Sequence, residues 1–436
     1  MTGLRGPARR LLEMYLLPSR DGHLIVAAVV MYATGSGLYL AGGTVFFLRG
    51  IHLSDAQLGL GLTTGGLAGF VTTVPACMLA TRFGPLRLLR MVQVWRAASL
   101  AALAFADDFY TFTLCVSLFL VSQGPVFPMA QLVVAGVVGD HDQTRSLGVV
   151  GSVANVGISI GAIAAAPFLG LGSLWGYRII LLLGSLCCLA SAGLYGLLTS
   201  KPAVPSGARS RWAGGLVLVA RDRRYLALTV VSGLLYLHTV LLSVGLPLWL
   251  VQSTDAPAGL LSALVTMNTV LAILVQVQVA RRIRGSRDGA RALGYAGFSL
   301  AAFCAVLIAS AHSRSLLTVG LLMLSTVLLT GGELLQGAGS WDLSYRHAPP
   351  ALRTEYLSVF ALGSAGTGII GPEIVALIVS WRTPGLVALC AFFVATATVI
   401  TLVGARLAHP GQPGAPAAQT TGAPQDGRPA LGTDTA

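Results

Sequence analysis

The chain consists largely of long apolar segments, each about as long as a helix that crosses a membrane. Only 10% of its 436 residues are charged and 55% are hydrophobic, whereas about 25% charged is usual in soluble domains. Lipid offers the backbone no hydrogen bonds, so a crossing segment must be a helix of about 20 residues or a strand of a closed barrel. Because the apolar runs are long and do not alternate, the sequence predicts an all-α membrane protein and excludes a barrel.

Hydropathy predicts twelve transmembrane helices. The first apolar run is too long for a signal peptide, lacks a convincing cleavage site and is followed by further spans, so we expect it to remain in the mature protein. The predicted spans cover residues 24–48, 57–80, 88–106, 110–138, 146–169, 177–198, 225–250, 258–280, 291–311, 315–340, 355–380 and 384–407.

Basic residues gather in alternate loops. Of the 28 Lys and Arg residues, only Arg49, Arg178, Arg314 and Arg382 fall on the opposite side, and Arg96 lies inside a span. The positive-inside rule then predicts that both termini and the central loop are cytoplasmic. The formal net charge of +12 is therefore a signal of orientation, aided by attraction to anionic lipid. It does not predict binding to nucleic acid.

A polar interruption at 199–223 divides the spans six and six, and we interpret it as a cytoplasmic linker. Equivalent features recur about 200–210 residues apart, such as Gly84 with Gly285. We therefore expect two pseudo-symmetric six-helix bundles, 24–198 and 224–407, around a cleft that holds the substrate near the midplane. Residues 1–23 and 408–436 are predicted to be a cytoplasmic N-terminus and a disordered cytoplasmic tail.

Signals of enzyme chemistry are missing from the sequence. The six cysteines all fall in apolar segments, without paired loop positions or metal-ligand spacing, so we expect no disulfide and no metal. The chain has no Walker-type phosphate loop, no H-E-x-x-H and no G-x-S-x-G motif. We expect neither an enzyme nor ATP-driven transport.

The loop after the second span carries the pattern of a known family. Residues 77–86 read CMLATRFGPL, where members of the major facilitator superfamily usually have G-x-L-A-D-R-x-G-R-R. Leu79, Ala80, Arg82 and Gly84 fit this pattern, and Arg87 lies close to the expected basic residues. Thr81 stands where the family has an Asp that helps to lock the cytoplasmic gate, and Cys77 replaces its Gly.

The chain resembles this superfamily over roughly residues 24–407, and several later segments resemble exporter-like members common in actinobacteria. The resemblance implies a monomeric secondary-active transporter of the plasma membrane that works by alternating access without a cofactor. It also implies that gate residues lie in the equivalent loops of both halves. The gate candidates are Thr81, Arg82, Gly84, Arg87, Arg145 and Arg353.

Glycines in the fifth and eleventh spans resemble a signature of drug exporters, G-x-x-x-G-P-x-x-G-G. Gly157 and Gly161 keep its spacing, although Ala162 replaces the Pro. Small residues let helices approach closely, and we predict that these positions pack the two bundles against each other, with ordinary packing inside a bundle as the alternative. The candidates for inter-bundle packing are Gly157, Gly161, Gly368, Gly371 and Pro372.

Only two acidic residues, Glu333 and Glu373, fall within predicted spans. A carboxylate is costly in a membrane when charged, so its protonation can be coupled to conformation. Glu333 is the first candidate for proton coupling, with a gate residue paired to an Arg as the alternative. Glu373 is the second, unless it faces water of the outer vestibule. His238 can relay the proton or contact substrate, or be hydrogen-bonded structure.

Polar and aromatic side chains in other spans suit a mostly apolar ligand with a few polar groups. The candidates for lining the cleft are Tyr32, Tyr39, Gln123, Tyr236, Asn268 and Trp341. Arg96 needs a partner or an aqueous path, and we expect it to pair within the amino-terminal bundle.

Together these patterns favour proton-coupled efflux of a drug or secondary metabolite, with the proton gradient as the energy source. Proton-coupled uptake of a nutrient is the first alternative, because the same fold can run in the opposite direction. A membrane sensor or enzyme that transports nothing is the second.

Overall fold

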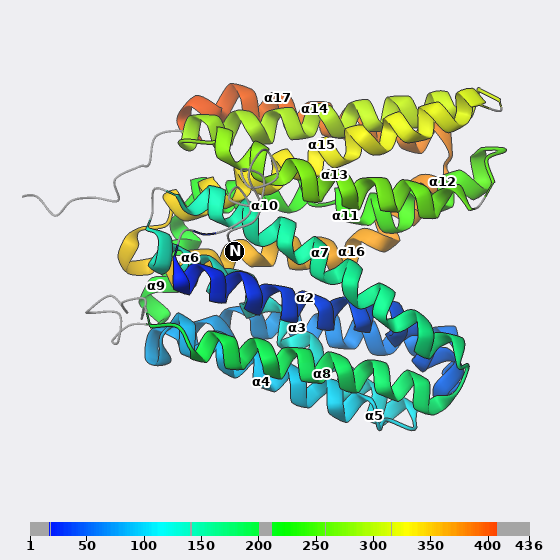
Figure 1. Ribbon diagram of the computed structural model, residues 1–436. Coiled ribbons are helices and arrows are strands. Elements are labelled where there is room, and N and C mark those ends of the chain that lie inside the picture. The colour runs from blue at the N-terminus through cyan, green and yellow to red at the C-terminus, as the bar shows by residue number, and fades with distance from the viewer. Residues whose placement is uncertain are drawn as a thin grey trace, which may run out of the picture.

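A computed structural model describes residue 17 and residues 19–139, 142–199, 212–257, 259–314 and 316–407. Within these ranges every regular element is helical, and the helices run side by side along one axis (Figure 1). The predicted all-α class is confirmed.

In the part of the chain that the structure describes, the amino-terminal half holds seven helices. They are α2 (Arg20–Val45), which continues into the π-helical turn η1 (Phe46–Gly50), α3 (Asp55–Phe83), α4 (Pro85–Leu103), α5 (Phe109–Val121), α6 (Gln123–Val138), α7 (Gln143–Gly170) and α8 (Leu174–Gly196).

A short helix, α9 (Trp212–Arg221), precedes the carboxy-terminal half and lies inside the segment predicted as a linker. The second half then holds α10 (Arg223–Leu235), α11 (His238–Val240), the π-helical turn η3 (Leu241–Gly245), α12 (Leu246–Ser253), α13 (Leu260–Arg282), α14 (Ser286–Ser310), α15 (Leu316–Arg346), the 3-10 turn η4 (Pro350–Leu352), α16 (Arg353–Ser380) and α17 (Thr383–Leu407).

Eleven helical segments of the described chain are long and apolar enough to cross a membrane. The remaining predicted span, 88–106, corresponds largely to α4, which is 19 residues long. Arg87, Arg90 and Arg96 make α4 less apolar than the others. All twelve predicted spans therefore correspond to helices.

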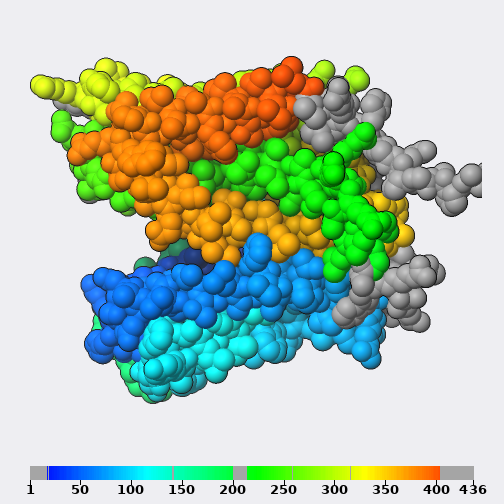
Figure 2. Space-filling model, turned by 180° about the vertical axis from the view of Figure 1, so that it is seen from behind, coloured from blue at the N-terminus to red at the C-terminus, as the bar shows by residue number. Residues whose placement is uncertain are grey.

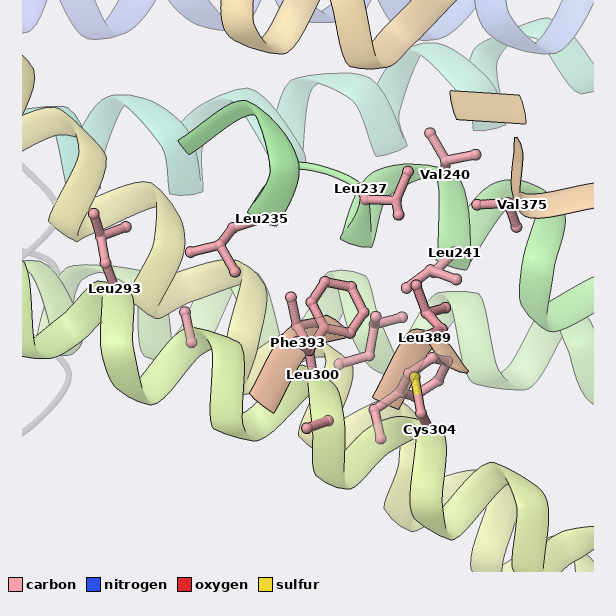
Figure 3. Packing of buried hydrophobic residues seen from close by; sticks show 14 of the residues in the cluster. Leu235, Leu237, Val240, Leu241, Leu293, Leu300, Cys304, Val375, Leu389 and Phe393 are labelled. Carbon is pink, nitrogen blue, oxygen red and sulfur yellow. The ribbon is translucent and has the colours of Figure 1, made fainter. Parts of the chain in front are cut away.

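Each half has its own apolar core. In the carboxy-terminal half, Phe393 of α17 lies among side chains from α10, η3 and α14, including Leu235, Leu241 and Leu300 (Figure 3). In the same core, Nε1 of the buried Trp249 donates to the Leu307 carbonyl oxygen at 3.0 Å. A buried indole needs such a partner. Burial of large apolar side chains thus stabilises each bundle separately.

Two predicted spans are interrupted in the middle. The span predicted at 110–138 divides at Ser122, between α5 and α6, and the span predicted at 225–250 divides at Tyr236 and Leu237. Proline explains the first break, because its ring removes an N–H and clashes with the carbonyl four residues earlier, and Pro125 lies four residues after Val121, where α5 ends. In the second span, Pro247 acts in the same way on Ser243, inside the π-helical turn η3. The second break places His238 at a loosened turn within the bundle.

The first and fifth spans of each half cross at glycines. A Cβ placed on Gly161 of α7 would overlap the carbonyl oxygen of Thr34 in α2, and one placed on Gly363 of α16 would lie 2.6 Å from the carbonyl oxygen of Thr229 in α10. The close approach therefore depends on the missing side chain. The two crossings show the internal repeat in three dimensions.

One end of the molecule, which we call the arginine-rich end, carries Gly84, Gly285, Pro349 and α9 and lies on the left in Figure 1. Here the two halves meet. Gly148 near the start of α7 faces Ala280 near the end of α13, where a Cβ would lie 2.6 Å from the alanine Cβ. Seen from behind, the surface is notched between α3 and α16 at the opposite end (Figure 2). We call the space behind this notch the cleft.

Candidate functional site

A half-buried carboxylate, that of Glu333, lies near the middle of α15. Glu333 Oε2 accepts a hydrogen bond of 2.9 Å from Asn268 Nδ2, which belongs to α13. The same amide nitrogen lies 2.9 Å from Thr330 Oγ1, one turn before Glu333. Asn268 is 5% exposed, so its amide is held in place by these two bonds. Two predicted site residues, Glu333 and Asn268, are therefore direct partners.

The interrupted helix between α10 and α11 adds His238 and Tyr236 to this group. Their rings meet edge to face with centroids 5.4 Å apart, and both side chains lie close enough to Glu333 to interact with it electrostatically. His238 Nδ1 lies 3.4 Å from Thr239 Oγ1. Its Nε2 is buried, and the Gln336 side chain lies beside the imidazole. The imidazole thus lies among Tyr236, Thr239 and Gln336.

Tyr32 of α2 extends the group into the amino-terminal half. Its side chain is half-buried and lies near Tyr236 of the opposite half. We call Tyr32, Tyr236, His238, Asn268 and Glu333 the cleft group. Five residues predicted separately from the sequence therefore meet at one place, on four different helical segments.

The floor of the cleft is aromatic. Trp341 of α15 packs against the amino-terminal cluster that includes Met129 and Leu147, and its ring centroid lies 6.3 Å from that of Phe127 in α6. Gln123 is exposed one turn before Phe127 on the same helix, and residues four apart share a helix face. Gln123 therefore lies on the face of α6 that carries the contact between Phe127 and Trp341.

Two other candidates lie apart from the cleft group. The Tyr39 ring packs on Phe119 with centroids 4.5 Å apart, inside the amino-terminal bundle. Glu373 is exposed on α16, one turn beyond Ile369, which faces Gly66 of α3 across the two halves. The structure therefore does not bring either side chain to Glu333.

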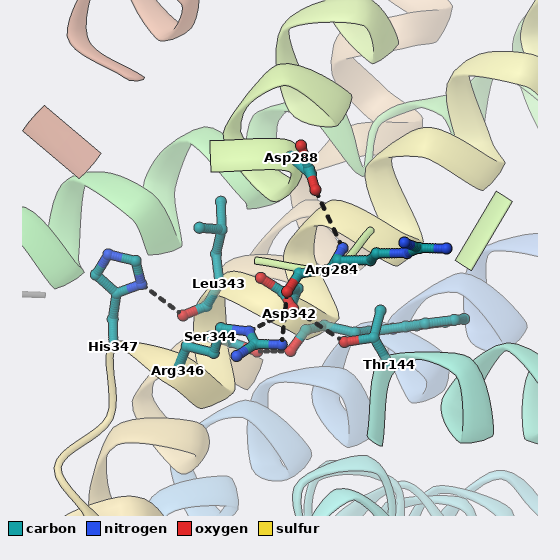
Figure 4. A network of polar contacts seen from close by, with 9 residues as sticks. Thr144, Arg284, Asp288, Asp342, Leu343, Ser344, Arg346 and His347 are labelled. Carbon is teal, nitrogen blue, oxygen red and sulfur yellow. Dashed lines mark hydrogen bonds and ion pairs between the residues drawn. The ribbon is translucent and has the colours of Figure 1, made fainter. Parts of the chain in front are cut away.

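A second polar site joins the halves at the arginine-rich end (Figure 4). Thr144 Oγ1 of α7 donates to Asp342 Oδ1 of α15 at 3.1 Å, and Arg346 Nε donates to the same oxygen at 2.6 Å. Asp342 is 0% exposed, and its Oδ2 has no hydrogen-bond partner in the part of the chain described here. Because the bond to Thr144 crosses between the bundles, we call these three residues the latch.

Another contact between the halves lies beside the latch. Ser152 Oγ of α7 donates to the carbonyl oxygen of Ile273 in α13 at 3.2 Å. Tyr345 packs against Ala135 of α6. The guanidinium of Arg353 lies over the Tyr345 ring, 4.0 Å from its centroid. The predicted gate residue Arg353 thus supports the contact between the halves through Tyr345.

The remaining gate candidates lie at the arginine-rich end without spanning the halves. Thr81 Oγ1 donates to the Met78 carbonyl oxygen of its own helix at 2.7 Å. Arg82 and Arg87 are exposed, and Arg145 is half-buried next to Thr144. Gly84 joins α3 to α4 with φ of 84°, a left-handed conformation that favours glycine.

The prediction that Gly157, Gly161 and Gly371 pack the two bundles together is wrong. Cβ atoms on Gly157 and Gly161 would meet α2 of the same half, and one on Gly371 would meet Val240 of its own half. Gly368 is exposed with nothing within 4 Å among the described atoms, and Pro372 is half-buried beside it. The glycines that face the other half are Gly66, Gly148, Gly151 and Gly366.

The sequence interpretation missed Asp342. It lies close to the predicted end of a span, where acidic residues are common and solvated, and only packing against α7 and α14 buries it. The spacing of Asp342 and Arg346, four residues apart on a helix, was the one signal of a pair. Within the described residues no group of three or more His, Cys, Asp or Glu side chains could hold a metal ion.

Comparison with known proteins identifies the fold. The family model of the Major Facilitator Superfamily matches residues 24–372. The chain belongs to this superfamily. It is therefore a multi-pass membrane protein and a transporter rather than an enzyme, and the predicted family is confirmed. No curated protein matches the sequence.

Solved structures of superfamily members share the architecture. The Escherichia coli fucose:proton symporter FucP has a TM-score of 0.66 at 16% identity, covering 88% of this chain and 98% of that one. The proton:xylose symporter XylE has a TM-score of 0.70 at 12% identity, covering 92% and 96%. A bacterial homologue of the iron transporter ferroportin, in an outward-facing state, has a TM-score of 0.67 at 13% identity, covering 89% and 99%. At these identities the likeness shows the fold alone.

Proposed function

We propose that this chain is a proton-coupled secondary transporter that exports an amphipathic small molecule, of the kind represented by drugs and secondary metabolites. The hydrogen bond between Glu333 and Asn268 in the cleft carries this proposal. An ionised carboxylate accepts that bond from the amide, while a protonated one can turn a hydrogen toward the cleft. Uptake and release of a proton at Glu333 therefore changes the polar groups that line the substrate path.

The surroundings of Glu333 support this role. The carboxylate is half-buried between Gly332 and Leu334, which are buried, and it has no Arg or Lys partner among the described residues. A permanent salt bridge would keep the Glu333 carboxylate ionised throughout the transport cycle. The neighbouring His238, whose ring meets that of Tyr236 edge to face, provides a second titratable side chain beside Glu333.

The orientation of the chain follows from its basic loops. We place the arginine-rich end in the cytoplasm of a cell with a plasma membrane, because arginine concentrates there. With the latch closed at this end and the surface notched at the other, the arrangement corresponds to an outward-open state. Alternating access then requires the latch to open while the outer ends of the two bundles approach. A monomer suffices, because one chain holds both bundles.

Proton-driven efflux from everted vesicles tests the proposal. We expect uncoupler-sensitive accumulation of a fluorescent amphipathic drug, and its loss with Glu333→Gln while Glu373→Gln retains it. The glutamine keeps the size and the hydrogen bond to Asn268 but cannot ionise. Coupled transport that Glu333→Gln leaves unchanged would contradict the assignment, and its loss with Glu373→Gln would point to that residue instead.

Uptake by symport is the second candidate, because FucP and XylE are described as proton symporters. The same vesicles distinguish the two directions. A labelled sugar or other nutrient that enters right-side-out vesicles down an inward proton gradient, with no drug efflux from the everted ones, would favour uptake.

A further inference from the structure

Arg96 is a buried cation whose hydrogen bonding is incomplete. It lies near the middle of α4 and is 1% exposed. Nη2 donates to Ser36 Oγ at 3.3 Å, while Nε and Nη1 have no hydrogen-bond partner among the described residues. A guanidinium has five N–H donors and is always charged. Several of its donors are therefore available to a ligand.

The surroundings of Arg96 supply π-electrons but no negative charge. Its Cζ lies 4.4 Å from the ring centroid of Phe119 and 5.0 Å from that of Tyr32, and the Cys188 thiol lies beside the guanidinium. The described acidic residues of the amino-terminal half lie at helix ends or in loops; they are Asp21, Asp55, Asp107, Asp108 and Asp142. Cation–π contacts compensate a buried charge only in part.

The Tyr32 ring covers one side of this cation. Its centroid lies 5.0 Å from the guanidinium carbon, and the side chain is half-buried and lies near Tyr236 of the opposite half. Rotation of the Tyr32 side chain would uncover the free donors of Arg96 toward Tyr236.

We propose that Arg96 and Tyr32 form an anion subsite that receives the carboxylate of an amphipathic substrate. The substrate anion would supply the missing counter-charge, and charge-assisted hydrogen bonds from a guanidinium to a carboxylate are among the strongest in proteins. The aromatic rings of Tyr32, Phe119 and Tyr236 would contact its apolar part. This inference rests on the proposed function, since it assigns the substrate class of the same cleft.

Binding to the purified full-length chain tests the subsite without a membrane or a gradient. The probes are matched pairs of a carboxylate and its neutral amide, at neutral pH and equal ionic strength: benzoate and benzamide, naphthoate and naphthamide, octanoate and octanamide. We expect at least one carboxylate to raise the thermal unfolding temperature while its amide does not. We also expect Arg96→Gln to weaken its binding by about tenfold or more.

Two further variants make the result specific. Arg178→Gln removes a cation paired with Asp107 at the outer end of the same half, 2.8 Å away, and should leave carboxylate binding unchanged. Arg96→Lys keeps the charge but changes the shape of the cationic group. It should bind the carboxylate more weakly than the native chain does, but more tightly than it binds the matching amide. This variant tests the subsite if Arg96→Gln fails to fold. Two results would overturn the subsite. In the first, the amide stabilises the protein as well as the carboxylate in every pair. In the second, Arg96→Gln and Arg96→Lys both leave carboxylate binding intact.

The outcome is distinguishable from that of the transport test. Arg96-dependent carboxylate binding without proton-driven flux would reject the proposed function and retain the subsite. Proton-driven flux of neutral or cationic compounds with no preference for carboxylates would reject the subsite and retain the proposed function.

Discussion

The latch offers the sharpest test of the alternating-access mechanism, through the substitution Thr144→Val. Valine has nearly the shape of threonine but lacks the hydroxyl that donates to Asp342 Oδ1 at 3.1 Å. Because Asp342 is fully buried, the lost donor is not replaced by water while the two halves remain closed. The substitution therefore raises the free energy of the closed arrangement more than that of an open one.

The size of the effect follows from the bonds that remain. Arg346 still donates to Asp342 Oδ1 at 2.6 Å, so the carboxylate keeps its charged partner and loses one of two donors. When a buried charged group keeps one of its two donors, loss of the other hydrogen bond costs about 1 to 2 kcal/mol. The ratio of closed to open molecules at the arginine-rich end should then fall by about 5- to 30-fold.

Distances between spin labels on the two halves measure this ratio. Arg90 and Arg287 are exposed at the arginine-rich end on opposite halves, and cysteines there can carry the labels once the six native cysteines have been replaced. We expect Thr144→Val to add a population with a longer distance. Thr326→Val is the matched control, because Thr326 is buried but donates only to the Leu322 carbonyl oxygen of its own helix. Unchanged distances in Thr144→Val, or an equal change in the control, would refute the latch.

Two further predictions concern stability. Gly161→Ala should lower the thermal unfolding temperature in detergent, at a cost of about 1 to 3 kcal/mol, because its Cβ would overlap the Thr34 carbonyl oxygen; Gly368→Ala, where a Cβ meets no described atom within 4 Å, should not. Hydrogen bonds, the largest from the backbone N–H of Thr111, lower the pKa of the exposed Asp108 at the start of α5. A carboxylate whose pKa is lower in the folded than in the unfolded chain stabilises the folded state above its unfolded pKa of about 4, and this stabilisation is lost as the pH falls through its folded pKa. Asn also caps a helix but carries no charge. Asp108→Asn should therefore lose less unfolding temperature than the native chain between neutral and acidic pH. An equal loss in both proteins would contradict this role of Asp108.

The residues of the cleft group show how far chemistry alone identifies a site. Glu333 and His238 stood out because ionisable groups are rare in apolar segments, and Asn268 because an amide suits a mostly apolar ligand with a few polar groups. The sequence could not pair them, since residues 65 positions apart become neighbours only when α13 packs on α15. It also did not place Tyr39 or Glu373 outside the group, because facing direction depends on which neighbours a helix acquires.

The glycines illustrate the opposite outcome. Their spacing in α7 predicted a close helix contact, and the contact exists, but with α2 of the same half rather than with the other bundle. Spacing along one helix fixes which residues share a face. It does not fix which helix that face meets.

By itself the sequence determined the class of protein, the number and order of the spans and the family, because hydropathy over about 20 residues is a local property and lipid leaves helices as the remaining solution. Tertiary structure decided the partners: the bond from Asn268 to Glu333, the stacking of Arg96 on Tyr32 and Phe119, and the burial of Asp342 against Thr144. Each of these depends on distances between helices far apart in the chain. Such distances are set by the packing of whole bundles, which no single segment encodes.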